Sequence, residues 1–463
     1  MNDSGIVFIV HHVDTEGPLW ENIEETFARL KNIFGLDIEP TYENLEKLQK
    51  GEIDLPPNQK QEIAIAVDPH ILGYKRNWAM IEEMLFRILN PFFRNQLIDS
   101  FGEGWIYNWH VMDHVGFGPE NPRHRDMGHH NIFDFYTDIL KNTNSVQDRI
   151  HWHFHPIPFY KQANVMATSY DNSISVLHQI LCRRLIDRNW FPVVNRAGFH
   201  AERPDSNLFL EQWIPFDPSN LAVDESQQPK YQKDQINGRF ADWKGAPSDW
   251  SLYHPSLYDW RLKGNANRVI ARILNLKTRH RNINIEEIEK AFVKAAAGEN
   301  GYLGLANHDW REMSVEINEF REMLNIVTQK YPEIRFRFSE SVDAFRQVLG
   351  YSPYEVEKNS IDLDVTLKDN NLLVDTLNGE IFGPQPYLAF KTKNGEYFHD
   401  NFDFLTPKKS FSYVFDENTI PLENIESIAV ASNDKYGNTF IKKFEPSKEK
   451  ITAKESPLVA GII

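Results

Sequence analysis

Residues 11–20, HHVDTEGPLW, follow a short apolar run and place two acidic side chains at the end of a predicted strand. Asp14 and Glu16 are separated by one residue, and Gly17-Pro18 ends the run with a turn. Two carboxylates this close repel each other when both are ionised. A cation bound by one acid relieves the repulsion and leaves the other free to act as a base. The stretch therefore predicts either a metal-binding pair of acids or a solvated turn.

A histidine-rich segment, IHWHFHP at residues 150–156, places three imidazoles at alternate positions. On an extended strand His151, His153 and His155 all point to one face, and on a helical turn His151 and His155 still share a face. Two neutral imidazoles and a distant carboxylate form the ligand set of many catalytic zinc sites and of other divalent ions with open positions. The segment is therefore the main candidate for metal binding.

Two further polar residues lie at the carboxyl ends of predicted strands. Arg196, in VVNRAGFHAERP, is followed by Ala197-Gly198, which are small enough to let other groups approach closely. Its guanidinium is suited to holding a carboxylate in one orientation. His308 ends GYLGLANH, with Asp309 beside it, and a hydrogen-bonded imidazole there can protonate a leaving group. For both residues the alternative is an ordinary polar position at a strand end.

Histidine is unevenly distributed, and eight of the 17 fall between His110 and His155. The additional polar residues of that segment are His110, Asp113, His114, His124, Asp126, His129 and His130. They could line the same crevice as the candidates above and supply a second metal site or substrate contacts. A polar loop is the competing interpretation.

Charge and composition are those of a soluble globular protein of 463 residues. With 50 Lys and Arg against 66 Asp and Glu, the net charge is -16. This balance argues against the phosphate backbone of nucleic acids, or an anionic membrane surface, as the main partner. No apolar stretch approaches the roughly 20 residues that span a bilayer, and no leader pattern of a basic then an apolar region opens the chain. We therefore expect a cytoplasmic protein without a membrane span.

Cysteine usage excludes two kinds of structural support. Cys182 is the single cysteine, and it lies in SISVLHQILCRRLI, whose apolar spacing indicates a helix. Disulfides within the chain and a structural thiolate zinc site are therefore excluded. The thiol is expected to be a core residue.

Up to about residue 350, short apolar strands alternate with longer stretches of helical periodicity. Repeated βα units predict a largely parallel sheet or barrel with helices outside. The predicted strands are 6–13, 105–112, 149–155, 191–198, 301–308 and 334–339, and the predicted helices are 78–93, 132–142, 173–189, 285–298 and 315–331. In such folds the carboxyl ends of the strands converge on one crevice, where the candidate residues fall.

After LGYSPYEVEKNS the pattern changes to short alternating strands separated by turn signals such as LNGE, KNGEY and KYGN. This pattern is typical of an antiparallel β-sandwich. The expected organisation is a barrel domain over 1–350, with an insertion at about 19–100, followed by a sandwich domain over 355–450.

The four motifs, in this order, resemble those of the polysaccharide deacetylases, carbohydrate esterase family 4, and of their relatives that hydrolyse cyclic amides. HVDTEGP is similar to the family's TFDDGP-like motif, and HWHFHP matches the His and Pro positions of its H-S/T-x-x-H-P motif. NRAGFHAERP is similar to the motif that carries an arginine, and LGLANH to the last motif, an apolar strand that ends in His. The resemblance covers about residues 5–350, and its specificity lies in the order of the motifs.

The resemblance implies a distorted (β/α) barrel with about seven strands and a role for each matching residue. Asp14 would be the general base and Glu16 the metal carboxylate, with His151 and His155 as the other two ligands, and zinc is the expected metal. Arg196 would orient Asp14, and His308 would be the general acid.

This chain departs from the family pattern at two places. Thr15 is an extra residue between the two acids, so either Asp14 or Glu16 could bind the metal. Trp152 stands where the family has a hydroxyl residue, and the ligand pair could instead be His153 and His155.

The expected activity is metal-dependent removal of acetyl groups from an N-acetylated sugar or a polysaccharide precursor. Two alternatives remain: a metal-dependent amide hydrolase acting on a small nitrogenous compound, and a non-catalytic protein that binds carbohydrate. The expected partner is thus a carbohydrate or a small amide, and the sequence leaves the oligomeric state open.

Overall fold

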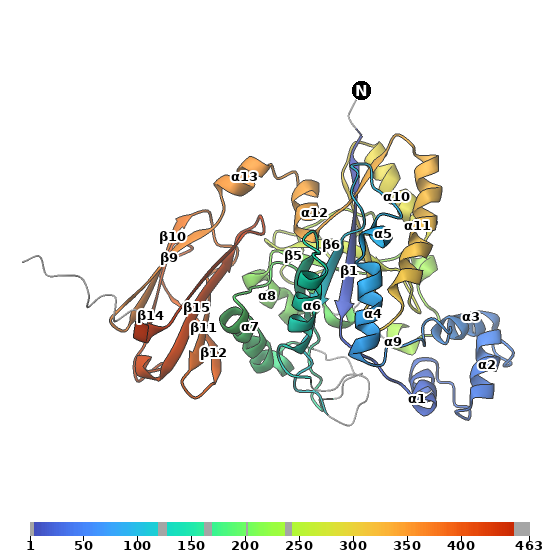
Figure 1. The fold of residues 1–463 in the computed structure, drawn as a ribbon, viewed down its shortest axis with the longest axis horizontal. Coiled ribbons are helices and arrows are strands. Elements are labelled where there is room, and N and C mark those ends of the chain that lie inside the picture. The colour runs from blue at the N-terminus through green and yellow to red at the C-terminus, as the bar shows by residue number, and fades with distance from the viewer. Residues whose placement is uncertain (1–3, 119–126, 162–168, 201, 237–242, 449–463) are drawn as a thin grey trace, which may run out of the picture. The chain divides into compact units, whose positions relative to one another are not determined.

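The computed structural model describes residues 4–118, 127–161, 169–200, 202–236 and 243–448. The chain forms two compact units (Figure 1). The first consists of residues 1–173, 194–208 and 216–350, and the second of residues 174–193, 209–215 and 351–463. The second unit therefore takes two segments from within the range 1–350 that was expected to form the barrel domain.

A parallel barrel forms the first unit. Its strands are β1 (Ile6–Thr15), β2 (Tyr107–Val111), β3 (Arg149–Phe154), β4 (Asn195–Ala197), β5 (Phe216–Asn220), β6 (Val269–Asn275), β7 (Gly301–His308) and β8 (Arg335–Phe338). Seven of them pair in the order β4-β3-β2-β1-β7-β6-β5, while β8 pairs with the first half of β1. A bridge between Val194 and Phe216 links the two ends, so the barrel is nearly closed. The predicted distorted barrel of about seven strands is confirmed.

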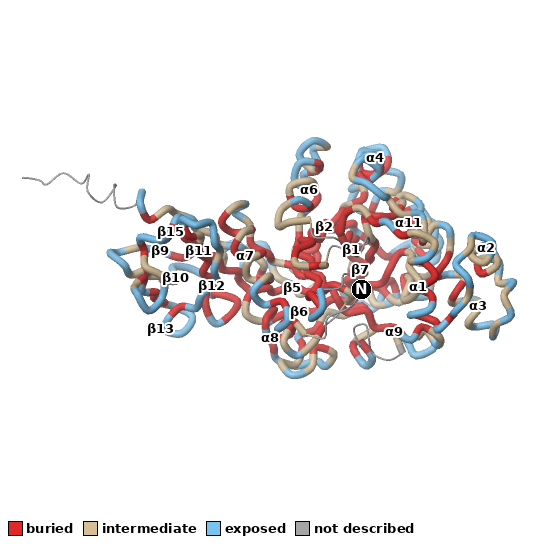
Figure 2. Tube along the Cα trace, turned by 90° about the horizontal axis from the view of Figure 1, so that it is seen from below, coloured by how far each residue is buried: buried red, intermediate tan, exposed pale blue. Residues whose placement is uncertain are grey.

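Strand β1 is at the centre of the barrel sheet and determines where the polar residues meet. Its apolar residues are almost completely buried, as expected for a parallel strand that is covered on both faces. Figure 2 shows the barrel strands as the buried interior of this unit. In the ladder Asp14 is aligned with His110 of β2 and with His308 of β7. The carboxyl ends of the strands therefore bring residues from distant parts of the sequence to one end of the barrel.

Two barrel strands were not among the predicted ones. β5 has the sequence FDPSN, and Asp, Pro and Asn are depleted in strands, so neither propensity nor alternation marks it. β6, VIARILN, contains a buried Arg272 whose guanidinium pairs with Glu287 of α10 (Ile285–Ala296). Both strands are fully buried, which shows that tertiary packing outweighs their local signals.

Helices surround the barrel strands in Figure 1. Those of the first unit, besides α10, are α1 (Ile23–Phe34), α2 (Tyr42–Lys50), α3 (Pro57–Ala66), α4 (Trp78–Ile88), α5 (Pro91–Arg94), α6 (Asn131–Asn142), α9 (Lys233–Ile236), α11 (Met313–Lys330) and α12 (Ser341–Val348). Helices α1 to α5 occupy the range expected for an insertion, and α1 to α3 share a small apolar core that includes Phe27 and Leu30. Helix α1 begins at a capping box between Asn22 and Glu25. Helix α8 (Pro204–Trp213) has residues in both units.

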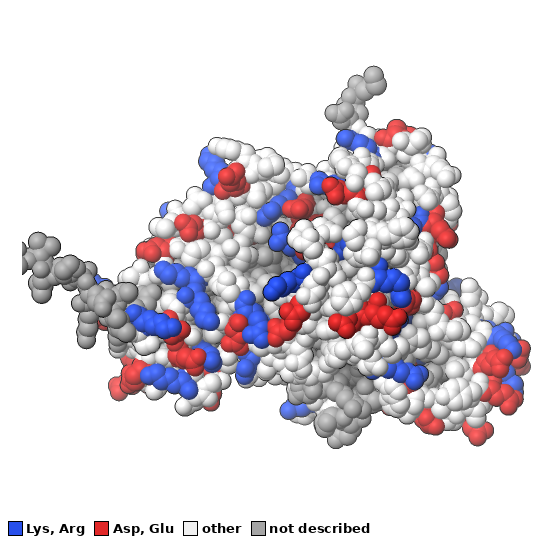
Figure 3. Space-filling model, in the orientation of Figure 1, with Lys and Arg blue, Asp and Glu red and all other residues white. Residues whose placement is uncertain are grey.

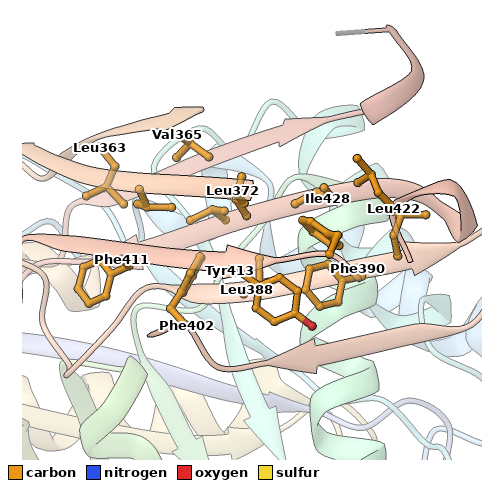
Figure 4. Close-up of a cluster of buried hydrophobic side chains, with 14 of the residues drawn as sticks. Leu363, Val365, Leu372, Leu388, Phe390, Phe402, Phe411, Tyr413, Leu422 and Ile428 are labelled. Atoms are coloured by element: carbon orange, nitrogen blue, oxygen red, sulfur yellow. The ribbon is translucent and has the colours of Figure 1, made fainter. Parts of the chain in front are cut away.

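The second unit contains two antiparallel sheets of four strands, with orders β13-β14-β10-β9 and β12-β11-β15-β16. Their strands are β9 (Asp362–Lys368), β10 (Asn371–Asn378), β11 (Tyr387–Thr392), β12 (Tyr397–Asp400), β13 (Asp403–Thr406), β14 (Ser410–Val414), β15 (Ile425–Asn433) and β16 (Thr439–Phe444). Their alternating apolar residues form one core (Figure 4). The predicted sandwich is confirmed, and it is accompanied by α7 (Ile174–Arg188) and α13 (Pro353–Lys358).

Acidic and basic side chains are interspersed over the face shown in Figure 3. Mixed charge of this kind provides no broad basic surface on that face for a polyanion. Within the described ranges, no helix combines the length and the apolar character needed to cross a membrane.

Candidate metal centre and active site

Three buried side chains converge at the carboxyl end of the barrel. Nε2 of His155 lies 3.1 Å from Oε1 of Glu16 and 2.9 Å from Nε2 of His153, and the remaining pair, His153 Nε2 and Glu16 Oε1, is 3.5 Å apart. Glu16, His153 and His155 are the group within the described residues that could hold a metal ion. A triangle of this size allows one point to lie roughly 2 Å from all three atoms, the length of zinc–nitrogen and zinc–oxygen bonds. The donor set therefore fits a divalent cation.

The tautomer of His153 suits a metal ligand. Its Nδ1 donates a hydrogen bond to the backbone carbonyl of Arg196 over 2.7 Å, which assigns the ring hydrogen to Nδ1. Nε2 then carries a free lone pair that faces Glu16 and His155. A carbonyl that fixes the far nitrogen of an imidazole in this way is the usual support of a metal-binding histidine.

The protonation of the two imidazoles is determined by burial and by the neighbouring carboxylates. Burial lowers the pKa of His153, but Asp14 and Glu16 outweigh that effect, and the net pKa is raised. For His155 burial dominates, and its pKa is lowered despite the attraction of Glu16. Protons therefore compete with a metal ion more strongly for His153 than for His155.

The predicted ligand His151 is not part of this group. His151 and His153 lie on one face of β3 and His155 directly follows its last residue, but each pair of residues advances about 6.6 Å along a strand. His151 therefore lies deeper in the barrel, where its Nε2 is 3.0 Å from Oε1 of Glu340 and 3.2 Å from Oδ1 of Asn108. The geometry brings together the alternative pair, His153 and His155, with Glu16.

Asp14 lies beside the metal-binding group but has different neighbours. Nε of Arg196 is 3.3 Å from its Oδ1, and Nε2 of His308 is 3.8 Å from its Oδ2. Oδ1 of Asp14 is buried and accepts no hydrogen bond from the described residues. Of the two acids, Glu16 is therefore the one placed for a cation, while Asp14 is held by the guanidinium.

His308 is stacked on Trp310, with ring centroids 4.1 Å apart. Burial lowers its pKa to about 4, even though Asp14 favours the charged form. The imidazole is therefore neutral near pH 7. Asp14, Arg196 and His308 are thus assembled as the sequence motifs suggested, and they come from β1, β4 and β7.

Asp309 has a structural role that the sequence did not reveal. Its carboxylate accepts hydrogen bonds of 3.1 Å from the backbone N–H groups of Glu16 and Gly17, and one of 2.9 Å from the hydroxyl of Tyr136. Burial raises the pKa of Asp309 to about 8, although all three donors favour its charged form. Asp309 thereby fixes the turn that carries Glu16. The adjacent acid in NHDW was visible in the sequence, but nothing in the motif indicated its partners.

His11 and His12, the first two residues of the stretch HHVDTEGPLW, lie in different surroundings. His12 is on the same face of β1 as Asp14, and its ring bonds to His110 over 2.8 Å and to the hydroxyl of Tyr302 over 3.0 Å. His11 is on the opposite face, where it accepts a hydrogen bond from the indole of Trp105. Burial lowers the pKa of His12 well below its usual value. Both rings are part of the core and neither belongs to the metal-binding group.

Among the additional polar residues of the segment 110–130, His114 contacts the site. Nε2 of His114 donates to the backbone carbonyl of Glu16. The ring of His110 contacts that of His12. His124 and Asp126 lie outside the described residues. Within those residues the structure contains no second metal-binding group.

No protein-family model, no curated protein and no solved structure matches this chain. The candidate site is therefore defined by its own residues: a convergent Glu-His-His group beside an Asp-Arg-His group at the carboxyl end of a parallel barrel.

Proposed function

We propose that the protein is a metal-dependent hydrolase that removes acetyl groups from an N-acetylated sugar or a polysaccharide precursor. The observation that carries the proposal is the buried group of Glu16, His153 and His155, with the carboxylate of Asp14 beside it. The order of the sequence motifs, which resembles that of the polysaccharide deacetylases, supports the choice of an acetylated sugar. Zinc is the proposed metal, because two imidazoles and one carboxylate with an open position form a typical catalytic zinc site.

Each residue has a defined task in this proposal. A divalent cation held by Glu16, His153 and His155 would polarise the acyl carbonyl and activate water for attack. The carboxylate of Asp14 takes the proton at Oδ2, the oxygen nearer His308, as the water attacks. Arg196 holds that carboxylate in one orientation through its 3.3 Å ion pair.

His308 acts on the leaving group. Because its pKa is lowered to about 4, the imidazole begins the reaction neutral and gains its proton during turnover. Asp14 is the nearest source, since its Oδ2 lies 3.8 Å from Nε2 of His308. The departing amine then receives that proton, and both groups return to their starting states.

Two alternative functions are carbohydrate binding without catalysis and hydrolysis of a small amide. Two acids, an imidazole pair, an arginine and a histidine in one buried site favour hydrolysis over simple carbohydrate binding. An amide hydrolase acting on a small nitrogenous compound needs the same residues, so a panel of N-acetylated sugars and small cyclic amides separates the two reactions.

Metal analysis of purified variants tests the proposal. We expect one equivalent of zinc in the wild-type protein and a loss of zinc and activity in His153→Ala and His155→Ala. His151→Ala is the matched control, because it removes an imidazole from the same strand face outside the group. Zinc retained in both ligand variants, or hydrolysis unaffected by their loss of metal, would contradict the proposal.

A further inference from the structure

Strand β4 serves two groups of the site through one residue. It is three residues long, and Arg196 is its middle residue. The guanidinium of Arg196 is paired with Asp14, and its backbone carbonyl accepts the hydrogen bond from Nδ1 of His153 on β3. The position of β4 therefore determines the surroundings of both the proposed base and a proposed metal ligand.

The other edge of β4 lies at the seam of the barrel, which is the junction between β4 and β5. There the backbones of the described residues meet in an isolated bridge, from Val194 to Phe216, and not in a ladder. A strand that is this short gains little alignment from one bridge, because backbone ladders are what fix neighbouring strands in a sheet. Other contacts must hold β4 in place on this side.

Side chains of β5 take the place of the ladder. The N–H of Ala197 donates to Oγ of Ser219 over 2.9 Å, and the hydroxyl of Ser219 donates in turn to Oδ1 of Asp217. Nδ2 of Asn195 donates to the same Oδ1 over 3.2 Å. The residues immediately before and after Arg196 are thus both held by one carboxylate.

The sequence of β5, FDPSN, suits this task. Pro218 has no N–H to offer a ladder. The pairing of β5 with β6 contains one extra residue between Asp217 and Asn220, and such bulges redirect side chains and are frequent next to active sites. Oδ2 of Asp217 pairs with Arg268, directly before β6, so the carboxylate is fixed at both oxygens. Asp217 and Ser219 are completely buried.

We infer that Asp217 and Ser219 are positioning residues for the metal-dependent reaction and act through β4. By fixing β4 at the seam, they set the direction of the guanidinium that holds Asp14 and of the carbonyl that holds His153. The charge of Asp217 also acts on Arg196 directly: burial lowers the pKa of the guanidinium, and Asp14 and Asp217 oppose that effect. The inference rests on the proposed function, because it gives these residues a task in that reaction.

Three serine variants test the inference. Ser219→Ala removes the link between Ala197 and Asp217, whereas Ser219→Thr keeps the hydroxyl. Ser341→Ala is the matched control, because it removes a hydroxyl that is equally buried in the same unit and bonds to the hydroxyl of Tyr302 over 3.0 Å.

The kinetic readout is the division between kcat and KM for an N-acetylated sugar. We expect kcat of Ser219→Ala to fall by about tenfold or more, because a misdirected base costs rate in the chemical step. KM should change little, since the seam residues do not hold the substrate. Ser219→Thr should restore kcat, and Ser341→Ala should have the wild-type value.

Cobalt(II) provides a readout that does not depend on activity, because its visible absorption reports the arrangement of its ligands. In Ser219→Ala the cobalt bands should shift and cobalt affinity should fall by about tenfold, since the carbonyl that orients His153 is displaced. Ser219→Thr and Ser341→Ala should keep the wild-type spectrum and affinity.

The outcomes separate this inference from the proposed function. Wild-type kcat and cobalt spectrum in Ser219→Ala, or an equal loss of both in Ser341→Ala, would overturn the inference alone. If Ser219→Ala does not fold, Asn195→Ala removes the other hydrogen bond to Asp217, and wild-type values there would overturn the inference in the same way. Wild-type protein that binds neither zinc nor cobalt would overturn the proposed function, and the inference with it.

Discussion

Asp309 accepts hydrogen bonds from the backbone N–H groups of both Glu16 and Gly17, each over 3.1 Å, and so ties the end of β7 to the turn after β1. In Asp309→Asn one side-chain oxygen can still accept a hydrogen bond. The other oxygen is replaced by an NH2 group, which cannot accept a hydrogen bond from the N–H that faces it. We expect metal affinity to fall by about tenfold, as is typical when the support of a metal ligand is lost. Competition with a chelating dye measures it. Tyr136→Phe removes only one of the three donors and should have a smaller effect, and equal affinity in the wild type and Asp309→Asn would contradict this role.

Gly198 leaves room for the ligand His155. A Cβ at this position would come within 2.5 Å of the carbonyl oxygen of Phe154 and closer still to the ring of His155. Gly198→Ala should therefore displace the imidazole and reduce zinc content, with activity falling in parallel. Gly301→Ala is the matched control, because a Cβ there lies 3.6 Å from the nearest atom. Full zinc content in Gly198→Ala would show that the ring adapts without loss of binding.

The pH dependence of metal binding follows from His153. Its pKa is raised in the folded protein, because the attraction of Asp14 and Glu16 outweighs burial. The proton and the metal compete for Nε2, so affinity should be full above this pKa and decline as the pH falls through it. Each displaced proton changes affinity by about tenfold per pH unit. Equilibrium dialysis between pH 8 and pH 5 measures this, and a flat profile would exclude His153 as a ligand.

Stability depends on a buried ion pair away from the site. The guanidinium of Arg94 donates to both oxygens of Asp148, over 2.9 Å and 2.7 Å, and the indole of Trp109 also donates to that carboxylate. Removing one member leaves an unpaired buried charge, so Asp148→Ala should reduce the free energy of unfolding by about 3–5 kcal/mol. Asp37→Ala, which breaks the exposed pair with Lys31, should change it by less than about 1 kcal/mol. Urea denaturation compares the two variants.

The sequence predicted the class of fold because apolar strands and amphipathic helices alternate with clear periodicity. It missed β5 and β6, whose Asp217 and Arg272 side chains form buried tertiary ion pairs with Arg268 and Glu287. The assembly of Asp14, Arg196 and His308 could be anticipated, since all three end parallel strands.

The ligand set could not be chosen from spacing alone. Alternation places three histidines on one face, and only the depth of each residue in the barrel separates His151 from His153. The role of Asp309 depends on a contact across 293 residues of sequence, which no local pattern encodes.

The path of the chain also limits how the protein can be divided. Helix α7 and residues 209–215 belong to the second unit, although barrel strands precede and follow them. Cys182 of α7 contacts the carbonyl of Phe398, and Asn433 of β15 donates to the carbonyl of Trp213. A fragment that begins at residue 351 would lack these packing partners, and one that ends at residue 350 would leave α7 without its sheet. The two units are therefore discontinuous in sequence. During synthesis, α7 cannot pack against its sheet until the strands of the sandwich have left the ribosome.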